Sequence, residues 1–144
     1  MSWTRDLSHG LAGYLAEHGV GTYRASGVYT DTETGIVVGA VPAAPARIVA
    51  LTPYRVTVDA TQADDVLGVQ VRARSAGQDP RDALDLIDAA FEALIGATHL
   101  DLSGVRVHLV EFLNSAPMGR DSSGRYEHVS NYRLTAHHPT AHRQ

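Results

Sequence analysis

The apolar and polar positions of the chain are most regular between Val66 and Gly96. The first part of this stretch, VLGVQVRARS, alternates with a period of two, which predicts a strand with one buried face. The buried side would carry Val69, Val71 and Ala73. The opposite side carries Gln70, Arg72 and Arg74. The strand is therefore expected to turn a basic face away from the core.

After a short break the period changes to three or four residues, which predicts an amphipathic helix. Asp79 is expected to cap this helix, Pro80 suits its first position, and Gly96 follows its last apolar residue. The predicted buried stripe comprises Ala83, Leu84, Ile87, Ala90, Phe91 and Leu94. The polar side comprises Arg81, Asp82, Asp85, Asp88 and Glu92.

Shorter patterns predict the remaining elements. A stripe of leucines predicts a first helix over residues 4–18, with Trp3 and Tyr14 packing it against a sheet. Pro53 closes one of the predicted strands, and residues 54–65 are interpreted as an exposed connection. The segments interpreted as strands, or as strand or loop in the first two cases, are residues 22–25, 36–41, 47–52, 98–102, 105–113 and 125–137.

Turn-forming residues predict the connections. Ser103 and Gly104 predict the tight turn of a hairpin. Residues 114–124, NSAPMGRDSSG, predict a loop that projects from the body. Residues 138–144 are expected to be a frayed tail on a single domain formed by residues 1–144.

The element order α-β-β-β-α-β-β-β predicts an α+β fold. We expect a mainly antiparallel mixed sheet with its two helices packed on one face. The other face would be polar, which indicates either a solvated surface or an interface with acidic neighbours. Its predicted members are Gln70, Arg72, Arg74, Arg106, His108 and Arg133.

Composition narrows the classes of function. The formal net charge of -4 disfavours a protein that reads nucleic acid, because such domains usually carry a net basic face. The chain has no cysteine, which fits folding in a reducing cytoplasm. No stretch suggests a membrane span or a signal peptide.

Motifs for catalysis are weak. The chain lacks a phosphate-binding loop with lysine and a G-x-S-x-G nucleophile elbow. The row Asp82, Asp85 and Asp88 could hold a cation, but the solvated face of a helix is the simpler interpretation. His137, His138 and His142 could grip a metal, whereas an exposed tail is the simpler interpretation of them. We therefore expect no enzyme activity, no bound metal and no cofactor.

A series of segments resembles a known family. The segments are IVALTPY at residues 48–54, LGVQVRAR at 67–74, DPR at 79–81 and SAPMGRDSSGRYEHVSNYRLTAHHP at 115–139. In order and spacing the chain is similar to the tail terminator proteins of long non-contractile-tailed phages, which are also labelled minor capsid or tail completion proteins. The similarity extends from the first helix to Pro139.

This resemblance implies structural work. Such proteins are small α/β subunits that assemble as a homo-hexameric ring on the end of the tail tube. They stop tube polymerisation and provide a surface for head-tail joining. The implied partners are other copies of the chain, the tail tube protein and a head-side connector. The implied location is the tail or neck of a virion assembled in the host cytoplasm.

Two surfaces are predicted to make these contacts. Arginine pairs well with carboxylates at an interface, so one subunit could present Gln70, Arg72, Arg74, Arg106 and Arg133 to the acidic row Asp82, Asp85 and Asp88 of another. The projecting loop could contact the tube or connector through Pro117, Met118, Arg120, Asp121 and Arg125. A head completion or neck subunit, or a small metal-dependent enzyme using the C-terminal histidines, are the alternatives.

Overall fold

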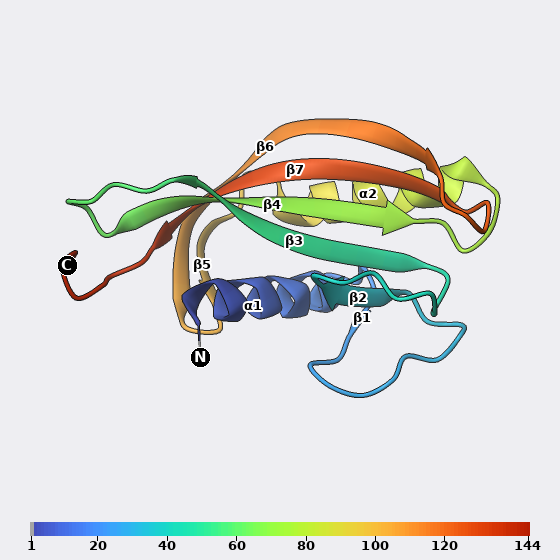
Figure 1. The fold of residues 1–144 in the computed structure, drawn as a ribbon, viewed down its shortest axis with the longest axis horizontal. Coiled ribbons are helices and arrows are strands. Elements are labelled where there is room, and N and C mark those ends of the chain that lie inside the picture. The colour runs from blue at the N-terminus through green and yellow to red at the C-terminus, as the bar shows by residue number, and fades with distance from the viewer. Residues whose placement is uncertain (1) are drawn as a thin grey trace.

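The computed structural model describes residues 2–144, which form two helices and a seven-stranded sheet (Figure 1). In chain order the elements are α1 (Trp3–Glu17), β1 (Thr22–Tyr23), β2 (Gly35–Val38), β3 (Ile48–Thr57), β4 (Asp64–Arg74), α2 (Pro80–Leu94), β5 (Thr98–Leu102), β6 (Val105–Arg120) and β7 (Tyr126–His137). The predicted order is confirmed, with the two-residue strand β1 added to it.

The sheet has the strand order β1-β2-β3-β4-β7-β6-β5. β1 and β2 run parallel to β3, and the other neighbouring strands pair antiparallel. Both helices bury their apolar side chains in one core with the inner face of the sheet. The α+β prediction is therefore confirmed. In Figure 1 the β3–β4 turn and the β6–β7 turn lie at opposite ends of the molecule.

Helix α1 begins where the sequence predicts. The Ser2 side chain accepts a hydrogen bond from the Arg5 backbone N–H at 3.1 Å and caps the first turn. Gly10 lies against β5, where an added Cβ would come within 2.5 Å of the Leu102 backbone. Glycine at this position therefore allows α1 to approach β5 closely. The Tyr14 hydroxyl donates to the Ala93 carbonyl at 2.7 Å and joins α1 to α2.

Helix α2 has the predicted cap at Asp79 and the predicted proline at its first turn. The prediction that Leu84 and Phe91 belong to its buried stripe is wrong. Leu84 is 44% exposed and Phe91 is 36% exposed. They lie to one side of the buried stripe, which consists of Ala83, Leu86, Ile87, Ala90 and Leu94.

Strand β3 is longer than predicted and continues through Pro53 to Thr57. β2 pairs with β3 only as far as Leu51. Pro53 is compatible with the strand because its missing N–H falls on a stretch that β2 does not reach. Residues 54–57 therefore belong to a β3–β4 hairpin and not to a loose connection.

The prediction of a projecting loop over residues 114–124 is wrong for residues 114–120, and only residues 121–125 form a turn between the strands. Residues 114–120 continue β6 and pair with β7 as far as Arg120, opposite Tyr126. Register shifts between Phe112 and Asn114 and between Pro117 and Gly119 accommodate the turn-forming residues within the strand. A hydrogen bond of 2.9 Å from the Asp121 N–H to the Arg125 carbonyl closes the turn.

The prediction that residues 138–144 form a frayed tail is wrong for Arg143, because this residue is buried. Its guanidinium bonds both carboxylate oxygens of Asp65, at 2.5 and 3.2 Å. A bidentate pair of this kind fixes geometry as well as charge. The C-terminal segment is thereby attached to the start of β4.

Arg74 alternates with the outer-face residues Gln70 and Arg72 as predicted, but it is buried and the expectation that it is free for a neighbouring subunit is wrong. Its guanidinium donates to the carbonyl oxygens of Pro42, Pro45 and Ala46 at 2.7 to 2.9 Å. The proline-rich segment folds over the end of β4 and supplies acceptors that the sequence pattern does not reveal. Arg74 is thus an internal anchor for residues 42–46.

We expect Arg74→Met to lower the free energy of unfolding by about 1 to 3 kcal/mol, because it leaves buried carbonyl groups without donors. Arg133→Met is the control, since Arg133 is partly exposed and should cost less than about 1 kcal/mol. Urea unfolding followed by circular dichroism measures both values. Equal losses in the two variants would contradict this role.

Candidate interaction surfaces

The outer face of the sheet carries the polar residues that the alternation predicts. The β4–β7 register places Gly68 opposite Arg133, Gln70 opposite Asn131 and Arg72 opposite Val129, so their side chains share one face. This face is mixed in charge and not basic. Arg72 pairs with Glu127 at 3.1 Å, and Arg133 lies 3.5 Å from Glu111.

Glu111 and Glu127 are the ion-pair partners of these arginines, and the sequence pattern does not predict them. They stand far from Arg72 in the chain and meet these arginines only through the register of β7. Gln70 is half-buried on the same face. Arg106 is exposed near the beginning of β6, toward the His137 end of the sheet.

The acidic row of α2 is divided between two environments. Asp82 bonds Arg47 at 2.8 Å and accepts from the Ala76 N–H at 2.7 Å, so it serves its own chain. Asp85 and Asp88 are exposed on the helix surface. These two carboxylates remain available to another molecule.

The β6–β7 turn is internally bonded. Asp121 and Arg125 pair at 2.8 Å, and Arg125 also donates to the Ala43 carbonyl at 2.8 Å. The hydrogen bonds from Arg125 help lower the pKa of Asp121 below its usual value. Met118 and Arg120 are exposed on the strand that leads into this turn. These bonds therefore hold the turn in a defined conformation.

Strand β6 has an outer edge that is only half covered. β5 and Ala97 pair with it as far as Val110, and none of the residues 2–144 pairs with the outer edge of Glu111–Arg120. Pro117 offers no N–H, so a partner strand would find its pairing groups along Glu111–Ala116. We call this stretch the β6 half-edge.

An apolar surface accompanies the β6 half-edge. Phe91 of α2 and Phe112 of β6 meet edge to face, with ring centroids 5.5 Å apart, and both are partly exposed. A groove of about 350 Å³ lies nearby between α2 and the β6–β7 hairpin. We call it the edge groove, and its lining includes Pro80, Ala83, Leu84, Pro117, Tyr126 and His128.

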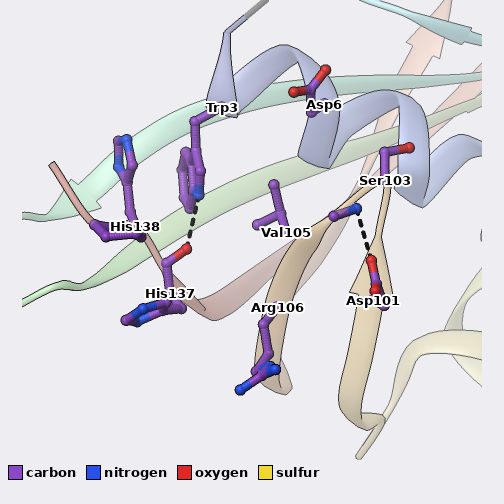
Figure 2. A pocket seen from close by; sticks show the side chains of 10 residues that line it. Trp3, Asp6, Asp101, Ser103, Val105, Arg106, His137 and His138 are labelled. Carbon is purple, nitrogen blue, oxygen red and sulfur yellow. Dashed lines mark hydrogen bonds between the residues drawn. The ribbon is translucent and has the colours of Figure 1, made fainter. Parts of the chain in front are cut away.

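A second concentration of polar groups lies where β4 begins and β7 ends (Figure 2). The Trp3 ring stacks on His138 with centroids 3.9 Å apart, and its Nε1–H donates to the His137 carbonyl at 2.9 Å. His138 bonds the buried Asp65 at 2.6 Å. These contacts border a cleft of about 630 Å³ that Arg106 also lines.

The alternative in which His137, His138 and His142 grip one metal ion does not fit the structure. His138 is engaged with Asp65 and Trp3, and His142 is exposed on the C-terminal segment. His137 instead joins residues that the sequence reasoning did not group with it. Its Nδ1 and the His108 Nε2 each lie 3.2 Å from Asp64 Oδ1. Strand register is the signal that would have revealed this cluster.

An open strand edge, an exposed apolar groove and charged faces are together typical of a subunit that contacts other proteins. Residues 14–137 match the family described as "Bacteriophage tail terminator protein", and the chain belongs to this family. The resemblance in the sequence is thereby confirmed. Bacteriophage tail terminator proteins are structural components of the virion.

A solved structure supports the fold. The chain is similar to a protein chain from the "Virion of native gene transfer agent (GTA) particle", with a TM-score of 0.61 and 18% sequence identity. The match covers 94% of this chain and 99% of the other. No curated protein matches the sequence. Among residues 2–144, no helix is long and apolar enough to cross a membrane.

The Asp65 carboxylate gives a prediction for acid unfolding. Hydrogen bonds from Arg143 lower its pKa below the usual value, although burial opposes the shift. The folded chain therefore favours ionised Asp65 above about pH 4, and this contribution is lost as the pH falls through the folded-state pKa. We expect the free energy of unfolding to decline below about pH 4, with a smaller pH slope in Asp65→Asn.

Urea unfolding curves at a series of pH values measure these slopes. Asp85→Asn is the matched control, because Asp85 is exposed on α2, and it should keep the slope of the unmodified chain. If Asp65→Asn left the pH slope of the free energy of unfolding unchanged, the stabilising role of ionised Asp65 would be contradicted.

Proposed function

We propose that this chain terminates a phage-type tail: it forms a homo-hexameric ring on the end of the tail tube and stops tube polymerisation. The ring then offers a surface to the head-side connector. Membership of the tail terminator family over residues 14–137 supports the class of function. The observation that carries the assembly proposal is the β6 half-edge with its apolar flank.

A cyclic ring requires two different surfaces on each subunit, one for each neighbour. We assign one of them to the side formed by α2 and the β6 half-edge. It combines unpaired backbone groups with apolar side chains of Leu84, Phe91 and Phe112. Burying this side against a neighbour is favourable, because a partner strand forms hydrogen bonds with the unpaired backbone N–H and C=O groups and the apolar side chains are removed from water.

The second surface is assigned to the outer face of the sheet near β3. Tyr54 is 40% exposed there and covers Gly68, which offers an apolar contact. Arg72 and Arg133 lie on the same face, with Gln70 between them. Asp85 and Asp88 of one subunit would face these arginines of the next, and Arg106 extends the charged face toward its far end. Arg74 is left out because it is buried, and Asp82 because it is bonded to Arg47 and to the Ala76 N–H. Arg72 and Arg133 are kept because both remain partly exposed beside their glutamates.

The β6–β7 tip is proposed to contact the tube or the connector. Pro117, Met118 and Arg120 would make this contact, since Met118 is 50% exposed on the approach to the turn. Asp121 and Arg125 would shape the turn through their ion pair. The tip lies at one extreme of the long axis, where it can reach beyond the ring (Figure 1).

Reversing the two exposed carboxylates of α2 tests the subunit interface. The double variant Asp85→Arg/Asp88→Arg should lose most of its ring species, because it places arginine against arginine. Native mass spectrometry measures the oligomer distribution. Glu17→Arg is the control, because Glu17 is exposed on α1 outside both proposed surfaces, and it should assemble as the unmodified chain does. Equal assembly of the double variant would contradict the proposed interface.

Particles that lack the protein test the proposed function. If the chain is a terminator, its loss should give tails of uncontrolled length in electron micrographs, and supplying the chain should restore a single length. Tails of normal length that remain unattached to heads would contradict the proposal. That result would identify a head completion or neck subunit instead.

A further inference from the structure

Three strands bring a set of metal-ligating side chains to one end of the sheet. Asp64 is the first residue of β4, His137 is the last residue of β7, and the register pairs them directly. His108 comes from the neighbouring strand β6. One ligand atom from each of the three residues lies within 4.8 Å of the other two.

We propose that Asp64, His108 and His137 bind a divalent transition-metal ion, with Zn²⁺ as the best match. Two imidazole nitrogens and one carboxylate oxygen form a donor set that zinc favours. Zn–N and Zn–O bonds of about 2.0 to 2.1 Å in a tetrahedron separate the ligand atoms by about 3.3 Å. Both histidine nitrogens lie 3.2 Å from Asp64 Oδ1. Binding therefore needs only a small closure of the two rings.

The carboxylate is in the form that a metal requires. The side-chain carboxyl of aspartate ordinarily titrates at about pH 4, so it is ionised at neutral pH. An ion placed among the three donors would replace the two histidine hydrogen bonds with coordination bonds.

The surroundings leave room for an external ligand. The three side chains border a hollow of about 350 Å³ that Gln62, Arg106 and Gln144 also line. Between 37% and 48% of each side chain is exposed. Three protein ligands leave a position for water or for a donor from another molecule. Arg106 is a nearby positive charge that opposes the ion.

This site differs from the one that the histidine-rich end of the sequence suggests, because it takes one of those three histidines and recruits partners from β4 and β6. None of its three ligands is assigned to a ring surface, although Arg106 both lines the hollow and extends the charged face of the second ring surface. Its proposed effect is to tie β4, β6 and β7 together at the end where the C-terminal segment attaches. The failure of either proposal leaves the other standing.

Titration of the full chain with ZnCl₂ tests the inference. Chain prepared without an affinity tag should bind one Zn²⁺ in isothermal titration calorimetry and unfold at a higher temperature with the ion. His108→Ala and His137→Ala should each weaken binding by about tenfold or more. Arg106→Gln should strengthen it, because a like charge has been removed. In the Co²⁺ form, the visible spectrum should show low-symmetry coordination that both alanine variants lose.

His142→Ala is the matched control, because it removes an exposed histidine outside the cluster. It should bind Zn²⁺ as the unmodified chain does. Circular dichroism of each variant without metal shows whether the fold is retained. Absence of saturable binding, or binding that His108→Ala and His137→Ala leave unchanged while folded, would overturn the proposal.

Discussion

The antiparallel pairing of β4 with β7 is the constraint on which the rest of the structure depends. Its register runs from Asp64 opposite His137 to Arg74 opposite Glu127. Because side chains alternate along a strand, a slip by one residue would turn the core face of β4 outward. The same register brings Glu127 near Arg72 and places Asp64 opposite His137, while the β6–β7 register adds Glu111 beside Arg133. β7 therefore links the core, the charged face and the proposed metal site.

The sequence predicts those parts of the fold that are periodic or locally marked. The alternation of β4, the capped helix α2 and the turn at Ser103 and Gly104 are all present, since short-range sterics and hydrophobic period determine them. The prediction is wrong for the second half of β6, where Pro117 and Gly119 suggest a loop. Pairing with β7 outweighs these turn-forming residues, and register shifts accommodate them within the strand.

Much less of the candidate surfaces could be predicted, because they depend on contacts between distant segments. Arg72 and Arg74 look equivalent in the alternation, yet one is half-exposed beside Glu127 and the other is buried under the proline-rich segment. Leu84 and Phe91 fit an apolar stripe but flank an uncovered strand. An apolar residue that the core does not need is consistent with a surface for another subunit, and the family membership gives that surface its proposed partner.

The central claim is that the β6 half-edge is an assembly surface, and amide hydrogen exchange tests it most directly. Backbone N–H groups of Glu111–Ala116 that face outward have no partner strand within residues 2–144 and should exchange quickly in the isolated subunit. The account predicts strong protection of this segment in assembled particles, together with α2, while the exposed Val28 loop exchanges equally in both states. Equal exchange of Glu111–Ala116 in free and assembled protein would contradict it.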